Sequence, residues 1–455
     1  MRTTITSLSG GYAMRSKTEI LESAKQENVR FIRLQFIDLF GTLKNVEIPV
    51  EQLDSALDGR IMFDGSSIQG FVRIEESDMY LKPDYNTWLI LPWSPQQARI
   101  ARLICNVHLP DDRPFAGDPR TILQRAVAEA QSMGLNACRV AVELEFFLLK
   151  LDQQGKPTTT PNDEGGYFDI APTDEGENCR RDIVMTLEEM GFRVASSHHE
   201  TAPGQHEIDL DFTDAVSAAD NIITLKMVAR TISRQRGLHA TFMPKPLQSA
   251  DGSGMHCYFS LFHEAEHAFA DAADTLHLSE MVRSYIAGLL FHAPGITAIT
   301  NPLVNSYKRL IPGYEAPSYI FWSTNHRMPF IRVSQASDTG THIELRSPDA
   351  SCNPYLAFGI SLYAGLDGIR KRMSLPSPVH QSIAAMSEEE RFRQGIRRLP
   401  TNLEQAVESL EEDEIIRTAL GEHAYAHFIQ AKLFEWEQYQ KTVHPWELNQ
   451  YVEQY

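Results

Sequence analysis

Four short segments carry ionisable residues at every second position, with apolar residues between them. In "RVAVELEFFLLK" the acidic positions are Glu143 and Glu145, and in "QHEIDLDF" they are Glu207 and Asp209. Residues two apart in a β-strand lie on the same face of a sheet. Each segment is therefore predicted to be a strand with one apolar face and one face that bears charged groups.

The other two segments add histidine and arginine to the pattern. In "SADGSGMHCYFS", a Gly-Ser-Gly loop that must bend tightly leads into a strand with His256 on its polar face. In "THIELRS", His342, Glu344 and Arg346 share one face. One interpretation is four ordinary strands with a face in water, which is common in antiparallel sheets. The alternative, favoured because these faces carry few Thr, Lys or Ser residues, is that all four line one cavity.

A shared cavity would collect five carboxylates and one imidazole: Glu143, Glu145, Glu200, Glu207, Glu344 and His256. At an effective dielectric constant of about 20, each carboxylate pair a few ångströms apart repels by roughly 3–4 kcal/mol. Two divalent cations would neutralise the group, and an oxygen-rich site without thiolates favours Mg²⁺ or Mn²⁺. Zinc is disfavoured because the polar faces offer one histidine ligand and no cysteine.

Arginines near glycine, proline and aromatic residues complete this pattern at Arg309, Arg327, Arg332 and Arg346. Their forked guanidinium groups match the oxygens of carboxylates and phosphates. Two metal ions and several arginines are a common means of stabilising a phosphoryl group during transfer. The sequence has neither a Gly-x-x-x-x-Gly-Lys-Ser/Thr loop nor a Gly-x-Gly-x-x-Gly turn, so a nucleotide would be bound by the sheet itself.

The composition of the whole chain narrows the class of protein. Among 455 residues, 60 are acidic and 42 basic, giving a formal charge of −18. This balance argues against a nucleic-acid partner and against binding to anionic membranes. The five cysteines are scattered without a Cys-x-x-Cys pair, and no segment has the pattern of a signal peptide or a membrane span. A cytoplasmic location is predicted.

Periodicity and turn residues predict an α+β fold, with a sheet or partial barrel backed by helices. After an extension at 1–15, a small strand-rich domain at 16–114 is expected to hold a helix at 17–27 and strands at 30–38, 43–50, 87–94 and 101–109. A second domain at 115–455 is expected to begin with a helix at 120–134, after the Asp118-Pro119 cap. Its predicted strands are 139–149, 206–212, 255–261, 329–333 and 341–347. Its other predicted helices are 178–190, 214–236, 279–293, 353–371, 403–411 and 422–438.

Five motifs give the chain a specific resemblance: "FDGSSIQGFVRIEESDMYL" at 63–81, "GQHEID" at 204–209, "HATFMPKP" at 239–246, "NSYKRLIPGYEAP" at 305–317 and "VHPWE" at 443–447. From about Ser16 to Tyr455 the chain resembles the type I glutamine synthetases of bacteria and archaea. The resemblance implies a small N-terminal β-grasp domain and a large catalytic domain with a curved antiparallel sheet. It also implies a dodecamer of two stacked hexameric rings, with active sites between subunits.

The implied activity is ATP-dependent ligation of ammonia to L-glutamate in two steps. The glutamate side chain first attacks the γ-phosphate of ATP, and ammonia then displaces phosphate from the γ-glutamyl phosphate. The implied ligands of two Mg²⁺ or Mn²⁺ ions are Glu145, Glu200 and Glu207 for one, and Glu143, His256 and Glu344 for the other.

The resemblance also implies roles for other residues. The positions that resemble glutamate-binding ones are Asp251, Gly252, Arg309, Glu315, Arg327 and Arg346. Those expected on the nucleotide and phosphate side are Tyr258, Ser260, Arg327, Arg332 and His342. Asp64, from an adjacent subunit, resembles the group that takes a proton from ammonium, and Glu315 resembles a carboxylate on a loop that closes over the intermediate. Arg327 is grouped with these two as catalytic.

Two stretches indicate a subtype. Arg73 occupies the position of the arginine found in the glutamine-feedback-inhibited branch, and residues 384–398 contain no tyrosine at which the other branch is adenylylated. A nitrogen-regulatory protein is a possible partner of this branch.

Several positions depart from the family pattern. Asp251 replaces an asparagine, and Tyr258, His342, Ser334 and Ala195 are unusual on the nucleotide side. Two alternatives therefore stand beside the main interpretation. One is a glutamate–amine ligase for a larger amine, suggested by Asp251. The other is a catalytically impaired glutamine-synthetase-like protein that senses glutamine or nucleotide.

Overall fold

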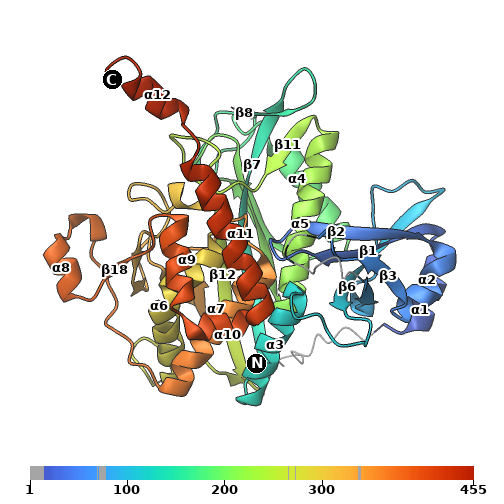
Figure 1. Ribbon diagram of the computed structural model, residues 1–455, viewed down its shortest axis with the longest axis horizontal. Helices are drawn as coiled ribbons and strands as arrows, with labels where there is room; N and C mark the ends of the chain where they lie inside the picture. The colour runs from blue at the N-terminus through green and yellow to red at the C-terminus, as the bar shows by residue number, and fades with distance from the viewer. Residues whose placement is uncertain (1–14, 69, 71–77, 265, 272, 337–339) are drawn as a thin grey trace, which may run out of the picture.

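The computed structural model describes residues 15–68, 70, 78–264, 266–271, 273–336 and 340–455. Figure 1 shows a small N-terminal part, drawn in blue, beside a larger part that holds the long sheet and most helices. Within the described residues, no helix combines the length and the apolar character needed to cross a membrane.

The N-terminal sheet has the strand order β2-β1-β6-β4-β3, with β5 paired to β6. It joins parallel and antiparallel pairs, since β1 runs parallel to β6 and antiparallel to β2. Its elements are α1 (Lys17–Gln26), β1 (Val29–Ile37), β2 (Leu43–Pro49), α2 (Leu53–Leu57), β3 (Ile61–Asp64), β4 (Asp78–Pro83), β5 (Leu89–Ile90) and β6 (Arg99–His108). A separate apolar core stabilises this part, with Ile32, Leu34, Leu81 and Leu103 fully buried.

The larger sheet has the path β15-β16-β17-β12-β7-β10-β9 and is antiparallel apart from the β15–β16 pair. Its strands on this path are β7 (Ala137–Leu151), β9 (Val194–His199), β10 (Gln205–Asp214), β12 (Met255–His263), β15 (Trp322–Ser323), β16 (Ile331–Ala336) and β17 (Gly340–Leu345). Three short strands extend it: β8 (Pro157–Pro161) and β11 (Leu238–Thr241) pair with β7, and β13 (Glu266–His267) pairs with β12. A separate ribbon joins β14 (Tyr319–Ile320) to β18 (Arg397–Arg398).

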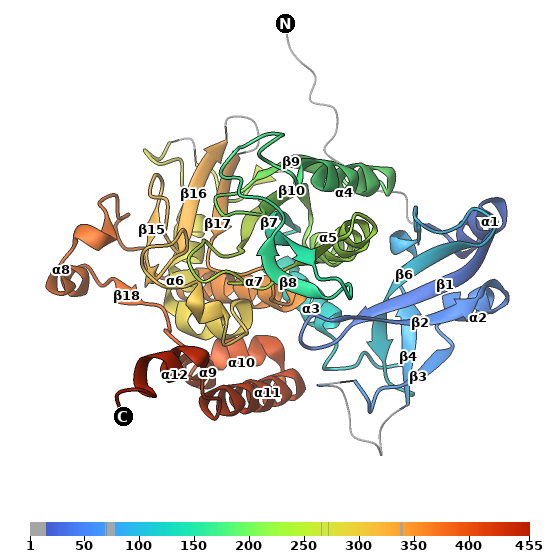
Figure 2. The ribbon, with the colours of Figure 1, turned by 90° about the horizontal axis from the view of Figure 1, so that it is seen from above.

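Helices cover the apolar face of the large sheet. In Figure 2 the strands lie above α6 and α7, and α9 to α11 form a further layer below these helices. The shared core includes Val142, Leu144, Met255 and Phe259 from the strands. The helices are α3 (Pro119–Ser132), α4 (Glu177–Glu189), α5 (Ala215–Gln235), α6 (Glu280–Thr300), α7 (Pro354–Lys371), α8 (Glu388–Arg393), α9 (Leu403–Glu411), α10 (Glu414–Leu420), α11 (Glu422–Gln440) and α12 (Pro445–Tyr451).

The predicted α+β class is confirmed, with a small N-terminal sheet and a larger, mostly antiparallel sheet in the second part of the chain. Most predicted elements lie within a few residues of the observed ones. The strand predicted at 87–94 is wrong in extent, because only Leu89–Ile90 pairs with β6. Pro92 has no N–H to continue the ladder, and the chain turns there through a hydrogen bond from Ser94 N to Leu91 O.

The helix predicted at 279–293 continues to Thr300 despite Pro294. A proline inside a helix leaves the carbonyl four residues earlier without its usual donor. Here Arg397 Nη2 donates to Leu290 O at 2.8 Å, which satisfies that carbonyl. Strands β3, β4 and β9 were not predicted. They are short or polar, so periodicity alone gave no signal for them.

Candidate active site

Strand register brings the charged positions of the four predicted segments onto one row of neighbours. On β7, Glu143 lies opposite His256 of β12, and Glu145 lies opposite Glu207 of β10. Tyr258 of β12 lies opposite Glu344 of β17. The interpretation in which each strand has an independent wet face is therefore wrong, and the shared polar face is confirmed.

One half of the site contains Glu143, His256 and Glu344, with one ligand atom from each within 4.8 Å of the others. His256 Nδ1 is 3.1 Å from Glu143 Oε2 and 3.8 Å from Glu344 Oε1. Tyr258 donates its hydroxyl to Glu143 Oε1 at 2.6 Å. We call this set of three acids and bases the Glu344 half.

Arginines neutralise the Glu344 half. Glu344 is fully buried, and both Arg332 and Arg346 form ion pairs with its carboxylate. Arg332 reaches Glu344 because the two residues are opposite each other in the β16–β17 register. The buried carboxylate is therefore paired with two cations that the protein itself supplies.

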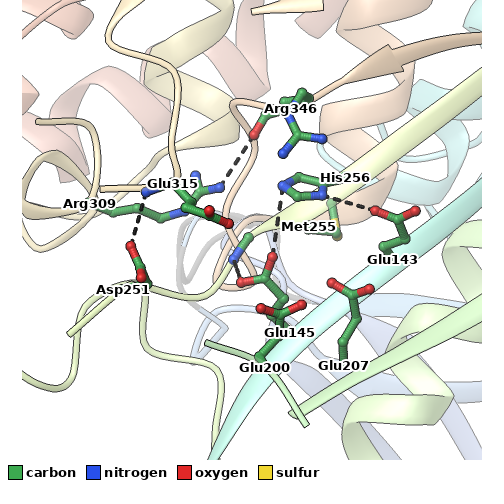
Figure 3. A network of polar contacts seen from close by, with 12 residues as sticks. Glu143, Glu145, Glu200, Glu207, Asp251, Met255, His256, Arg309, Glu315 and Arg346 are labelled. Carbon is green, nitrogen blue, oxygen red and sulfur yellow. Dashed lines mark hydrogen bonds and ion pairs between the residues drawn. The ribbon is translucent and has the colours of Figure 1, made fainter. Parts of the chain in front are cut away.

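The other half, the Glu207 half, consists of Glu145, Glu200 and Glu207. Each of these carboxylates belongs to a residue that is 5 to 8% exposed. Glu145 Oε2 accepts from Gln205 Nε2 at 3.0 Å and from the Gly254 N–H at 2.8 Å. Figure 3 shows the three carboxylates gathered on one side of His256.

Histidines flank the Glu207 half. His198 Nε2 is 2.9 Å from Glu200 Oε1 and 3.7 Å from Glu207 Oε1. His256 Nε2 is 3.8 Å from Glu145 Oε1 and thereby joins the two halves. Ligand atoms within 4.8 Å of one another occur in two overlapping sets here, one with Glu145, Glu207 and His256 and one with His198, Glu200 and Glu207.

The two halves have opposite electrostatics. Burial alone would raise the pKa of Glu143, but hydrogen bonds from His256 and Tyr258 outweigh it and lower the pKa to about 2. Burial and repulsion from neighbouring carboxylates, Glu145 first among them, raise the pKa of Glu207 to about 12. Burial likewise raises the pKa of Glu145. Burial would also raise the pKa of Glu200, but hydrogen bonds with His198 and Thr201 lower it. Among the described residues, the Glu207 half therefore has histidines beside it but no arginine or lysine in an ion pair.

These residues fit divalent cations. The ligand set is dominated by carboxylate oxygens, which Mg²⁺ and Mn²⁺ prefer. His256 Nε2 is a buried ring nitrogen without a hydrogen-bond partner among the described residues. A buried polar atom of this kind calls for a ligand or water. The repulsion felt by Glu207 is of the sort that a bound cation removes.

Asp251 and Glu315 meet at the edge of the site. The backbone N–H of Glu315 donates to Asp251 Oδ1 at 3.0 Å, as Figure 3 shows. Arg327 Nη1 is 3.9 Å from Glu315 Oε1, and the Arg327 side chain is 88% exposed. Its guanidinium is therefore available to a ligand at the surface of the loop.

Arg309 and Gly252 lie below this loop. Arg309 is 1% exposed and donates from Nη1 to Ser347 O at 2.8 Å and from Nη2 to Arg346 O at 3.3 Å. A Cβ at Gly252 would lie 2.2 Å from Pro244 O and 3.2 Å from Arg309 Cγ. The close approach that the glycine loop suggested is therefore real, and it is made to Pro244 and Arg309.

Residues predicted on the nucleotide side are turned inwards. His342 Nδ1 is 2.5 Å from Ser260 Oγ, and both residues are buried. The His342 ring also lies against Phe212, with ring centroids 4.6 Å apart. The Tyr258 hydroxyl donates to Glu143 and accepts from Arg332. Their predicted contacts with a nucleotide stay predictions.

Two predicted residues lie away from this cavity or outside the described chain. Asp64, exposed at the end of β3, accepts from Ser66 N at 2.8 Å and from the Ser66 hydroxyl at 2.6 Å. Figure 2 shows β3 far from β7 and β17 of the same chain. Arg73 lies outside the described residues.

Sequence reasoning missed several residues that touch the site. Gln205 and His198 contact the carboxylates directly. The stacked rings of Tyr167 and Phe168, 4.1 Å apart, lie against the His198 ring. Phe168 has φ 61°, a conformation rare for a bulky residue. The Gly-Gly-Tyr-Phe run was the available signal, because paired glycines beside exposed aromatic rings mark a special loop.

Comparisons with known proteins agree with this geometry. The family model "Glutamine synthetase, catalytic domain" matches residues 116–451, and "Glutamine synthetase, beta-Grasp domain" matches residues 28–110. The glutamine synthetase of Staphylococcus aureus (strain MW2) is 54% identical over 440 residues, covering 97% of this chain and 99% of that protein. That of Staphylococcus epidermidis is 53% identical with the same coverage.

Solved structures share the fold. GmaS in complex with ADP matches with a TM-score of 0.85 and 29% identity, over 96% of this chain and 100% of that chain. The cryo-EM structure of Plasmodium falciparum glutamine synthetase matches with a TM-score of 0.86 and 24% identity, over 97% and 99%. The β-grasp domain and the carboxylate-lined sheet define a two-domain ligase.

The chain belongs to the glutamine synthetase family. Its activity is that of a glutamate–ammonia ligase of the bacterial type I class. Proteins of this family use glutamate, ammonia, ATP and divalent metal ions and form oligomers.

Proposed function

We propose that this ligase makes glutamine through γ-glutamyl phosphate, with two Mg²⁺ or Mn²⁺ ions held on the shared polar face. Glu145, Glu200 and Glu207 would hold one ion, and Glu143, His256 and Glu344 the other. The observation that carries this proposal is the convergence of these six side chains from separate segments, in overlapping sets of ligand atoms that lie within 4.8 Å of one another. Bound ions would supply positive charge to the oxygens of ATP and of the acyl phosphate.

The arginines of the Glu344 half have two states in this proposal. In the structure, Arg332 and Arg346 are both engaged by Glu344. Each guanidinium has five N–H donors, and a cation bound to Glu344 would leave more of them available to a substrate. Arg332 would then bind phosphate oxygens, and Arg346 would bind glutamate. A planar fork of donors suits both tasks.

Other glutamate and phosphate contacts are assigned by motif position and supported by placement. Arg309 and Gly252 form the floor below the Asp251 loop. Arg327 is exposed beside Glu315 and would grip the phosphoryl group when the loop closes. Ser260, His342 and Tyr258 are assigned to the nucleotide side, and their present inward contacts require that they act mainly by shaping that wall.

Ammonium would enter at a cluster of negative charge. The pKa of Tyr167 is raised by burial and by the carboxylates of Glu200, Glu207, Glu315 and Glu143, which all act on its hydroxyl. Anions and an aromatic face favour a cation over neutral ammonia. Glu315, with Asp64 of a neighbouring subunit, would take the proton that converts ammonium into the nucleophile.

This use of Asp64 requires a neighbouring subunit, and the dodecamer of two hexameric rings is carried over from the family resemblance. Two features support an assembly. Asp64 is exposed and far from the cavity of its own chain. Helix α12 projects from the body in Figure 1, and Trp446, Leu448 and Val452 on it or just beyond it are 59%, 49% and 71% exposed. Exposed apolar groups in such number favour a protein partner.

Location and regulation complete the proposal. All five cysteines are free, which supports a reducing, cytoplasmic location. Feedback inhibition through Arg73 and control by a nitrogen-regulatory protein are carried over from the subtype resemblance, and both stay proposals.

A larger amine is the second candidate, and one contact favours it. Asp251 holds the backbone of Glu315, so its carboxylate adds negative charge beside the loop that covers the amine. Extra negative charge favours a more cationic substrate. A catalytically impaired sensor is the third candidate, motivated by the substituted positions on the nucleotide side.

One assay separates the three candidates. Phosphate release is measured with Mg·ATP and glutamate, using ammonium, methylamine, ethylamine or a polyamine as acceptor. We expect release with ammonium. Release only with a larger amine would replace the first candidate by the second, and no release with any acceptor would leave the sensor.

A further inference from the structure

A second cluster of buried ionisable groups lies on the opposite face of the β9–β10 pair. His199 and His206 face each other in register, one residue out of phase with His198 and Glu207. With Asp163 and Asp174 they form a fully buried group whose ligand atoms lie within 4.8 Å of one another. We call this group the hairpin cluster.

A cation already occupies one side of the hairpin cluster. Arg180 Nη1 is 2.8 Å from Asp174 Oδ2 and 2.7 Å from His206 Nδ1. A divalent ion placed there would be repelled by the buried guanidinium. The cluster therefore consists of two pairs. Arg180 on helix α4 pairs with Asp174, which lies just before that helix. Asp163 pairs with His199, which lies beside the turn between β9 and β10.

The Asp163–His199 pair has a defined protonation pattern. His199 is fully buried, with Nδ1 2.7 Å from Glu200 O and Nε2 3.0 Å from Asp163 Oδ1. A carbonyl oxygen only accepts, so Nδ1 donates to it. Asp163 Oδ1 also accepts from the Gly204 N–H at 2.9 Å, which favours the carboxylate. The pair is a buried hydrogen bond between the His199 ring and the Asp163 carboxyl group.

This pair holds both ends of the turn that joins β9 to β10. His199 binds the carbonyl of Glu200 at the start of the turn, and Asp163 binds the N–H of Gly204 near its end. The turn is closed by a hydrogen bond from Glu200 N to Gln205 O at 2.8 Å. Its two ends carry the Glu200 carboxylate and the Gln205 amide, which donates to Glu145.

We propose that Asp163 and His199 are positioning residues that set the metal affinity of the Glu207 half, by fixing the turn that presents Glu200 and Gln205. The inference rests on the proposed two-metal function. It predicts an effect on one ion only, because the Glu344 half is built from β7, β12 and β17 and takes nothing from this turn. Partners that orient metal ligands typically change affinity by about 10- to 100-fold when removed.

Asp174 supplies a matched control. It is 1% exposed and belongs to the same cluster, but its ion pair is with Arg180 and not with the turn. Asp163→Asn and Asp174→Asn thus remove equally buried charges that differ in their contact with Glu200. His199→Asn is a milder variant, since its amide retains a donor near the position of Nδ1 while the contact with Asp163 is lost.

The test is Mn²⁺ titration of the full-length protein without nucleotide, followed by electron paramagnetic resonance of free Mn²⁺. We expect two ions in the wild type, an affinity weaker by about 10-fold or more at one site in Asp163→Asn, and a smaller loss at the same site in His199→Asn. Asp174→Asn is expected to bind both ions within about twofold of the wild type. Thermal unfolding of each variant records the purely structural cost.

Three results would overturn the inference. Wild-type binding of both ions by Asp163→Asn would do so, as would an equal loss in Asp174→Asn. If Asp163→Asn does not fold, unchanged binding by His199→Asn is decisive in the same way. Absence of Mn²⁺ binding in the wild type would remove the proposed function together with this inference, whereas the other results remove the inference alone.

Discussion

The two halves of the carboxylate cavity solve the same electrostatic problem differently. In the Glu344 half, Arg332, Arg346 and His256 surround a fully buried carboxylate. In the Glu207 half, His198 contacts Glu200 and Glu207, His256 lies 3.8 Å from Glu145, and no arginine or lysine forms an ion pair among the described residues. The first half has arginines of the protein paired with its buried carboxylate, whereas the second depends on a bound cation or on protons to relieve the repulsion at Glu207.

This difference indicates a division of work. Arg332 and Arg346 can bind either Glu344 or a substrate oxyanion, so the Glu344 half is suited to binding phosphate. Charge that must be imported makes the Glu207 half dependent on its ion for both stability and activity. A carboxylate that is destabilised when empty is also a strong ligand, because metal binding relieves the repulsion.

The largest expected effect is on turnover. Glu207→Gln should lower kcat/KM by about 100-fold or more, because it removes a ligand from the half that, among the described residues, has no arginine or lysine ion pair. Asp209→Asn is the matched control, two residues along the same face of β10 and outside the proposed ligand set. The kcat/KM of Asp209→Asn should fall by less than about 10-fold. Equal losses in steady-state glutamine formation would contradict the division between the two positions.

The next effect concerns stability without metal. Glu344→Gln should destabilise the protein by about 3–5 kcal/mol, because Arg346 is left as a buried cation and Arg332, whose side chain is 33% exposed, also loses its anion. Glu207→Gln should stabilise it, because it removes a carboxylate from among like charges. Urea unfolding in EDTA measures both. If both variants change the free energy of unfolding in the same direction, the proposed electrostatic difference between the two halves is wrong.

A third effect is a pH dependence that belongs to one half. The pKa of Glu207 is raised from 4.5 to about 12 in the metal-free fold. The fold therefore favours the protonated acid, and this stabilisation is complete below about pH 4.5 and is lost as the pH rises toward 12. Metal-free protein should lose up to about 1.4 kcal/mol per pH unit from this group between pH 6 and about 9.

The measurement is the difference in unfolding free energy between wild type and Glu207→Gln at each pH, in EDTA and with Mg²⁺. The glutamine variant lacks the ionisable group and should lack this part of the slope. Mg²⁺ should abolish the difference, because the bound ion keeps Glu207 ionised. An identical slope in both proteins would place the titration elsewhere.

The smallest effect is at the edge of the cavity. Asp251→Asn keeps an oxygen for the Glu315 N–H but removes one negative charge. We expect the KM for glutamate to fall by about fivefold, corresponding to about 1 kcal/mol of repulsion in a solvated site. An unchanged or higher KM, with kcat measured alongside, would remove Asp251 as a cause of altered substrate binding.

Much of the site could be predicted because its charged residues follow the two-residue alternation of side chains in a β-strand. Alternation on β7 and β12 is enough to put Glu143, Glu145 and His256 on polar faces and Val142, Leu144 and Met255 in the core. Glu200 lies in a turn and has no periodic signal, and its assignment to one particular ion came from the resemblance. His198 and Gln205 carry no pattern that separates them from ordinary strand-end residues, so their contacts were missed.

The sequence by itself determined the polar faces, the kinds of metal they favour, the helix caps such as Asp118, and the family. Only the tertiary structure decided which charges are compensated. His256 meets Glu143 across 113 residues of sequence, and Arg332 meets Glu344 because β16 and β17 pair in one register. A strand's own residues fix which side chains share a face, but the neighbour they face is selected by long-range pairing. That pairing added Arg332 to Arg346, which lies only two residues from Glu344 in the sequence, and it left Glu207 among carboxylates.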